Sequence, residues 1–91
     1  MKVIQSRIFA RKVKKLHKQD KLALDDQLRK IIQNPSLGEE KKGELKGIFV
    51  YKFKLGSTHY LMAYKFSEKI LELIMLGSHE NYYRDLALFL K

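Results

Sequence analysis

The stretch that decides the fold is IFVYKFKLGSTHYLMAYKF, residues 48–66, in which hydrophobic side chains recur at every second position. A period of two is typical of β-strands, because successive side chains point to opposite faces of a sheet. Gly56 and Ser57 interrupt the pattern and predict a tight turn. We therefore expect an antiparallel hairpin made of residues 48–55 and 58–66.

The alternation also assigns the two faces of this hairpin. The core face is expected to carry Phe49, Tyr51, Phe53, Leu55, Tyr60, Met62, Tyr64 and Phe66. The other face then carries Lys52 and Lys54 about 6–7 Å apart at strand spacing, with His59 on the neighbouring strand. Two ammonium groups at this distance repel each other unless an anion lies between them. This open face is therefore a candidate docking surface for an anion, or else an ordinary lysine-bearing solvent face.

Helical periodicity precedes the hairpin. Residues 2–5 can form a short first strand, after which Ser6 is a suitable N-cap for a helix. Asp20 is expected to cap a second helix that ends at Asn34-Pro35, since the residue before a proline avoids helical angles. The apolar sides of these two helices are Phe9, Val13 and Leu16, then Leu24, Leu28, Ile31 and Ile32. Two helices joined by a few residues should form an antiparallel pair.

The remaining segments complete an α+β fold. Residues 36–47 read as a polar loop, and residues 70–76 as a third strand, apolar on both faces except at Glu72. A short C-terminal helix is outlined by the spacing of Tyr82 or Tyr83, Leu86, and Phe89 or Leu90. We expect a single domain, residues 1–91, in which an N-terminal helical hairpin packs on one face of a small antiparallel sheet.

Composition limits the class of protein. The chain has 91 residues, 45% of them apolar and 32% charged, which suits one modest core. It has no cysteine, so disulfides, zinc–thiolate sites and thiol catalysis are excluded. No signal peptide is evident and the longest apolar run, residues 73–76, is too short to cross a bilayer, so we expect a cytoplasmic protein without membrane association.

The net charge of +9 is the most informative bulk property. Residues 1–47 hold 13 basic and 6 acidic side chains, so most of the excess lies in this half. Such an excess suggests a polyanionic partner, most often nucleic acid, or else a solubilising lysine surface. The first helix and the start of the second carry a basic stripe of Arg7, Arg11, Lys14, Lys15 and Lys18, our candidate surface for RNA or ribosome binding.

The densest group of reactive side chains is GSHENYYR, residues 77–84, at the end of the third strand. His79 can act as a general acid or base, Tyr83 can stack on a base and Arg84 can hold phosphate. Alternatively, Ser78 caps the last helix and one tyrosine fills the core. The sequence has no P-loop, no paired acidic motif for magnesium and no Ser-His-Asp pattern, so we expect no metal and no cofactor. A nuclease of this kind would use the 2′-hydroxyl of RNA as its nucleophile.

The chain resembles the RelE/ParE superfamily of bacterial type II toxins along nearly its whole length. The resemblance rests on residues 34–35, 38–39, 43–47, 50–54, 61–65 and 76–80. Its RelE-like branch consists of ribosome-dependent endoribonucleases, whose strand lysine pair matches Lys52 and Lys54. Leu61 stands where that branch has an arginine. The Gly-Ser-His-x-x-x-aromatic ending is similar to the YafQ branch, which implies active-site roles for His79 and Tyr83, and His59 lies close to an acidic catalytic position of that branch.

Three functions are compatible with this resemblance. The first is a toxin that cleaves messenger RNA on the ribosome, with His79, Lys52, Lys54, Tyr83 and His59 as catalytic candidates. The second is a ParE-like inhibitor of DNA gyrase that acts by binding protein and needs no catalytic histidine. The third is a basic RNA-binding module or a toxin that has lost its activity. The resemblance also implies an acidic antitoxin as the cognate partner.

Overall fold

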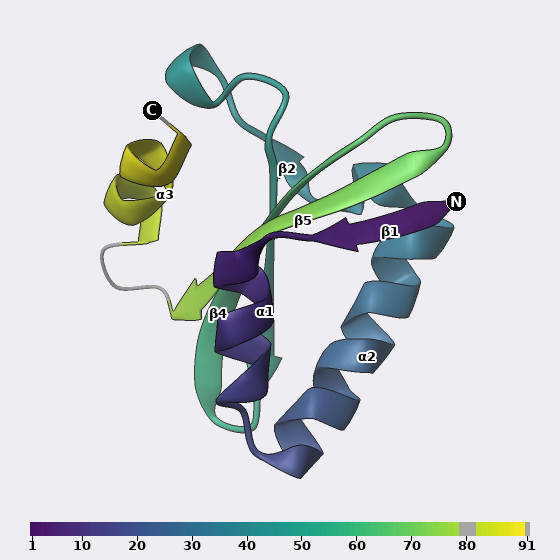
Figure 1. Ribbon diagram of the computed structural model, residues 1–91, viewed down its shortest axis with the longest axis vertical. Helices are drawn as coiled ribbons and strands as arrows, with labels where there is room; N and C mark the ends of the chain where they lie inside the picture. The colour runs from purple at the N-terminus through teal and green to yellow at the C-terminus, as the bar shows by residue number, and fades with distance from the viewer. Residues whose placement is uncertain (79–81, 91) are drawn as a thin grey trace.

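The computed structural model describes residues 1–78 and 82–90, without the side chains of residues 83–85 and 89 (Figure 1). Its helices are α1 (Arg7–Lys14), α2 (Lys18–Gln33) and α3 (Tyr82–Leu90), with short 3₁₀ turns η1 (Pro35–Leu37) and η2 (Gly43–Leu45). Its strands are β1 (Lys2–Gln5), β2 (Glu39–Glu40), β3 (Phe49–Leu55), β4 (Thr58–Phe66) and β5 (Ile70–Ser78). The expected α+β class is confirmed.

The strands form one sheet in the order β1-β5-β4-β3-β2. The chain from β2 to β5 is an antiparallel meander, whereas β1 runs parallel to β5 and makes the sheet mixed. The predicted hairpin is present as β3 and β4, with Leu55 opposite Thr58 across the turn. Gly56 has a φ of +61° in that turn, a conformation that glycine adopts without strain. Residues 36–47 are not all loop, because Glu39 and Glu40 pair with β3.

Helices α1 and α2 run in opposite directions on one side of the sheet (Figure 1). The Ser6 hydroxyl caps α1, since it accepts a hydrogen bond from the Phe9 amide at 3.0 Å and donates one to the Ile74 carbonyl at 2.6 Å. Asp20 was expected to cap α2, which is wrong: the helix begins one turn earlier, at Lys18, and Asp20 lies in its first turn. Ile32, expected in the apolar stripe, is 40% exposed. Neighbouring residues of a helix point about 100° apart, so Ile32 is turned away from the core that buries Ile31.

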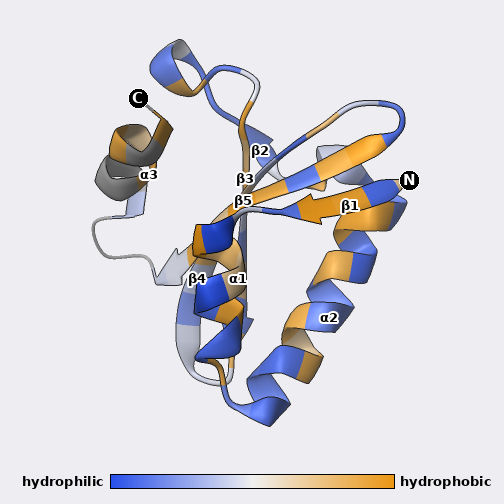
Figure 2. Cartoon of the chain, viewed as in Figure 1, coloured by the Kyte–Doolittle hydropathy of each residue, from blue (hydrophilic) through white to orange (hydrophobic). Residues whose placement is uncertain are grey.

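The core on the helical side of the sheet follows the predicted alternation except at Phe66, which ends β4 and is 37% exposed. Buried residues from α1, α2 and three strands form this cluster: Phe9, Leu24, Ile31, Phe53, Leu55, Met62, Tyr64, Leu71, Leu73 and Leu76. Figure 2 shows the strand β5 largely hydrophobic and the start of α2 hydrophilic. Among the described residues, no helix is long and apolar enough to cross a membrane.

The opposite face of the sheet is not fully open, contrary to the expected free docking surface. Helix α3 packs on it, on the side away from α2 (Figure 1). Buried residues of α3 and the strands form a second cluster: Ile48, Val50, Leu61, Ala63, Ile74, Tyr82 and Leu86. The physical reason is that this face carries aliphatic side chains at Val50, Leu61 and Ala63, which need cover. The uncovered part is the end of the hairpin with Lys52 and Lys54.

Tyr64 of β4 joins η1 and the residue before β2 to the sheet. Its buried hydroxyl donates to the Pro35 carbonyl at 2.6 Å and accepts from the Gly38 amide at 2.9 Å. A Cβ atom at Gly38 would come within 2.7 Å of this hydroxyl and 3.1 Å of the Val50 carbonyl, so only glycine fits. These contacts place β2, which contains Glu39, beside β3.

Candidate functional site

The β3–β4 hairpin places three of the candidate catalytic side chains on one face. Lys54 lies directly opposite His59 in the antiparallel register, and Lys52 lies opposite Leu61. Because residues two apart on a strand share a face, Lys52 and Lys54 both lie on the face that α3 partly covers. Lys52, Lys54 and His59 are exposed to solvent. The structure thus brings together the strand lysines and His59.

A hollow of about 200 Å³ lies beside these cations. It is lined by Lys52, His59, Tyr60 and Leu61. Leu61 is 1% exposed and gives the hollow an apolar base, while Lys52 and His59 are exposed on the same face. The Tyr60 ring packs against Phe53 on the other face of the sheet, so an anion bound beside the two ammonium groups would have an apolar surface next to it. This combination suits a nucleotide, whose phosphate is charged and whose base is flat and weakly polar.

Strand β5 ends next to this hollow. Gly77 lies opposite Leu61, and Ser78, the last residue of β5, lies opposite Tyr60. A Cβ atom at Gly77 would come within 3.2 Å of the Tyr82 ring, so this glycine allows the first residue of α3 to pack closely on the sheet. His79 follows Ser78 in the sequence but lies outside the described residues, and its role stays a prediction.

Helix α3 begins at Tyr82, whose side chain packs in the core. Tyr82 is 1% exposed and its hydroxyl donates to the Met75 carbonyl at 2.8 Å, so it is the tyrosine that fills the core. Tyr83 and Arg84 lie in the helical backbone of α3, but their side chains lie outside the described ones. Their predicted contacts with RNA stay predictions.

Glu39 is a neighbour of the site that the sequence analysis missed. Glu39 lies opposite Val50 in the β2–β3 pair. Lys52 is two residues after Val50 on β3, so Glu39 and Lys52 lie on the same face of the sheet. The hydrogen bond from the Lys41 ammonium lowers the pKa of the Glu39 carboxyl below its ordinary value, and the charges of Lys41 and then Lys52 add to the effect. Residues 38–39 are part of the family resemblance, but the sequence indicated no role for Glu39, because β2 has only two residues and is defined by its pairing.

The basic stripe lies on the other side of the sheet. Arg7, Arg11 and Lys14 belong to α1, Lys15 follows it, and Lys18 begins α2. All five side chains are exposed. The buried side of α1 carries Phe9, which belongs to the cluster on the helical face. The stripe and the lysine pair are therefore two separate basic surfaces.

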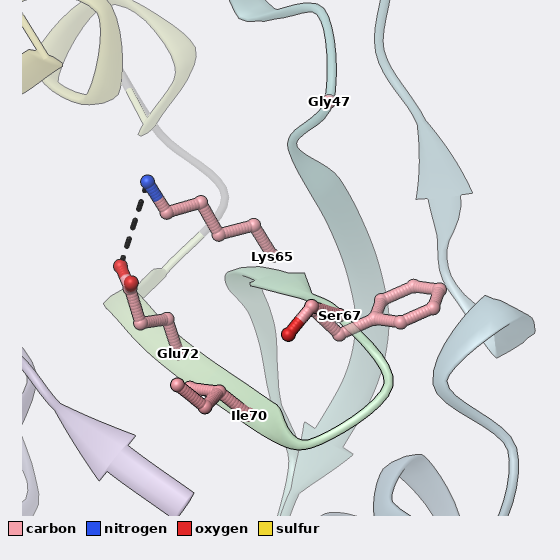
Figure 3. A pocket seen from close by; sticks show the side chains of 6 residues that line it. Gly47, Lys65, Ser67, Ile70 and Glu72 are labelled. Atoms are coloured by element: carbon pink, nitrogen blue, oxygen red, sulfur yellow. Dashed lines mark ion pairs between the residues drawn. The ribbon is translucent and has the colours of Figure 1, made fainter.

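A second hollow, at the opposite end of β4, carries different chemistry (Figure 3). It is lined by Gly47, Lys65, Phe66, Ser67, Ile70 and Glu72. The Lys65 ammonium lies 3.6 Å from the Glu72 carboxylate, so the two charges there neutralise each other. In the described part of the chain, no three histidine, aspartate or glutamate side chains group as metal ligands would. The lysine pair with His59 is therefore our candidate site.

Comparison with known proteins defines the class. Residues 3–87 match the family model described as ParE-like toxin of type II bacterial toxin-antitoxin system. The match covers most of the chain, so the chain belongs to this family and is a toxin of a type II toxin–antitoxin system.

Solved structures share the fold at low sequence identity. A mutant of E. coli toxin RelE in the free state has a TM-score of 0.71 and 18% identity, with 96% of this chain and 93% of that chain covered. RelE in the intact E. coli RelBE toxin–antitoxin complex has a TM-score of 0.69 and 18% identity, with 87% and 96% covered. YafQ from E. coli has a TM-score of 0.60 and 18% identity, with 89% of this chain and 96% of that chain covered. No curated protein matches the chain significantly.

Proposed function

We propose that this toxin is a metal-independent endoribonuclease that cleaves messenger RNA on the ribosome, in the cytoplasm. The observation that carries the proposal is the grouping of Lys52, Lys54 and His59 on one exposed face, beside the strand end that precedes His79. These side chains are suited to phosphate binding and proton transfer. The resemblance to the RelE-like branch supports the choice of substrate.

The proposed reaction is attack of an RNA 2′-hydroxyl on the adjacent phosphate. One base removes the 2′-hydroxyl proton as the new P–O2′ bond forms, and one acid protonates the 5′-oxygen as the P–O5′ bond breaks. His79 takes one of these roles, with His59 as the candidate for the other. Lys52 and Lys54 neutralise the charge that develops on the phosphate oxygens, and Tyr83 stacks on or orients a base. The products carry a 2′,3′-cyclic phosphate and a 5′-hydroxyl.

The test measures cleavage of ribosome-bound message by purified variants. We expect His79→Ala to lower the rate most, by about 10²- to 10⁴-fold, the usual contribution of a general acid or base. Lys52→Ala and Lys54→Ala should each cost less, and the double variant more, because adjacent cations partly replace each other. Lys65→Ala is the matched control, since Lys65 lies on the same face of β4 but at its other end.

Two results would contradict this mechanism. Cleavage that requires a divalent metal, revealed by loss of activity in EDTA, would exclude the 2′-hydroxyl route as the whole mechanism. His79→Ala activity at the native rate would remove His79 from the reaction. Mapping the product ends for a cyclic phosphate distinguishes the two failures.

We also propose an acidic antitoxin as the physiological partner. The net charge of +9 favours fast association with an anionic segment, and RelE has been solved in complex with its antitoxin RelB. Expression of the chain without a partner should stop growth, and co-expression of its cognate antitoxin should restore it. Normal growth at high expression of the chain without a partner would rule out an active toxin in that host.

Inhibition of DNA gyrase is the second candidate function. Two observations favour it: the matching family model is ParE-like, and the buried Leu61 stands where the RelE-like branch has an arginine. A gyrase inhibitor would block DNA supercoiling while cell-free translation continues with intact message. The ribonuclease would give the reverse result.

A further inference from the structure

The loop between β2 and β3 carries a basic group that the candidate site does not include. Lys41, Lys42 and Lys46, with Glu40 and Gly43, line a hollow of about 430 Å³. Gly43 and Gly47 have φ values of +70° and +86°, a conformation that costs glycine little and fixes the path of this loop. The loop is thus a shaped surface in which three lysines line a concavity.

This group is continuous with the lysine pair through Glu39. The Lys41 ammonium donates a hydrogen bond to the Glu39 carboxylate at 2.5 Å, and the Lys41 amide extends the ladder by bonding the Ile48 carbonyl. On the other side of Glu39, the charge of Lys52 is close enough to lower the pKa of the Glu39 carboxyl. Lys54 and His59 follow along the same face. We name Lys41, Lys42, Lys46, Lys52, Lys54 and His59 the cationic edge.

We propose that the cationic edge binds single-stranded RNA on one side of the scissile phosphate. The six residue steps from Ile48 to Lys54 span about 20 Å of extended chain, the length of about six stacked nucleotides at roughly 3.4 Å each. The cationic edge includes Lys52, Lys54 and His59, the side chains proposed to act at the scissile phosphate, which favours RNA over an acidic peptide. This proposal rests on the ribonuclease function and extends its site.

Substitution of Glu39 should change RNA affinity in the opposite direction to substitution of the lysines. The Glu39 carboxylate accepts a hydrogen bond from the Lys41 ammonium and lies on the same face as Lys52, so it is a negative charge with which an incoming phosphate must compete. Replacing it by glutamine should therefore strengthen RNA binding, whereas replacing Lys42 and Lys46 should weaken it. A surface that contributes to stability alone would not give opposite effects on binding.

The experiment measures fluorescence anisotropy of labelled 2′-O-methyl oligoribonucleotides, which cannot be cleaved through a 2′-hydroxyl. We expect the affinity to rise from dinucleotide to hexanucleotide and then level off. Lys42→Gln with Lys46→Gln should lower hexanucleotide affinity by about tenfold, reduce the salt slope by about 1.4 for two lost phosphate contacts, and leave the dinucleotide unaffected. Glu39→Gln should raise hexanucleotide affinity a few-fold.

The matched control is Lys12→Gln with Lys30→Gln, which removes the same charge from exposed positions on α1 and α2. Equal losses in the two double variants, an affinity independent of length, or stronger competition by an acidic peptide of equal charge would each overturn the proposal. Because the probes are not cleaved, binding does not depend on catalysis. Length-dependent binding by a chain that cleaves no message would overturn the ribonuclease function and leave the RNA surface standing.

Discussion

Tyr64 is the residue on which the position of β2 depends most directly. Its hydroxyl pairs a carbonyl of η1 and an amide just before β2, two backbone groups that a phenylalanine would leave without this partner. Burial raises the pKa of the Tyr64 phenol above its ordinary value, because the charged phenolate is poorly solvated there. The neutral hydroxyl therefore both stabilises the fold and resists ionisation.

We expect Tyr64→Phe to lower the free energy of unfolding by about 1–3 kcal/mol, the cost of leaving partly buried polar groups unpaired. Tyr51→Phe is the control, because it removes one hydrogen bond, to the Gln27 side chain, and should cost about 0.5–1.5 kcal/mol. Urea unfolding at neutral pH measures both. A loss for Tyr64→Phe no larger than that for Tyr51→Phe would show that the backbone holds β2 without the hydroxyl.

The pH dependence of this difference has a defined sign. A group whose pKa is raised on folding contributes its stability fully below its unfolded pKa, here near 10, and loses it as the pH rises through the folded pKa. The stability advantage of the native chain over Tyr64→Phe should therefore be constant up to about pH 10 and shrink above it. Urea titrations of both proteins over the alkaline range test this, and an advantage that grows with pH would contradict it.

At the scale of elements, α3 is the cover of the second sheet face. Leu86 is fully buried in the cluster with Val50 and Leu61, whereas Leu88, one half-turn away, is 62% exposed. The same substitution at these two positions therefore separates packing from helix propensity. It also tests whether the floor of the candidate site depends on α3.

We expect Leu86→Ala to destabilise the protein by about 2–5 kcal/mol, because it removes a buried side chain and leaves a cavity. Leu88→Ala should change stability by less than about 0.5 kcal/mol. Thermal and urea unfolding provide the measurement. Equal effects of the two substitutions would mean that α3 does not pack on the sheet in solution.

At the scale of the whole molecule, the positive charge is divided between two sides of the sheet. The basic stripe lies on α1 and the start of α2, and the cationic edge lies on the face that α3 partly covers. Under the proposed function, one surface would bind ribosomal RNA and the other the message. The two surfaces can be tested separately because they share no residue.

We expect Arg11→Glu with Lys15→Glu to weaken ribosome binding, since exposed cations contribute mainly through phosphate contacts that salt screens. Both positions are exposed, so the free energy of unfolding should change by less than about 0.5 kcal/mol. Co-sedimentation with ribosomes over a salt series measures the effect. Binding that is unchanged at every salt concentration would make the stripe an ordinary solvated face.

The sequence by itself determined the elements whose signals are local. The alternation of residues 48–66 predicted the hairpin and its two faces, and the helical spacing around Phe9 and Leu24 predicted α1 and α2. The same alternation placed Lys52, Lys54 and His59 on one face. These features depend on neighbours within a few residues, and side-chain periodicity records such neighbours directly.

Tertiary structure decided what depends on contacts between distant segments. The pairing of β1 with β5, the placement of α3 over Leu61, and the position of Glu39 beside Lys52 each join residues far apart in the chain. Strand β2 is too short to have a period, and Glu39 became part of the site only because Tyr64 and Gly38 hold it against β3. Such contacts follow from the packing of the whole core, which no local pattern of residues encodes.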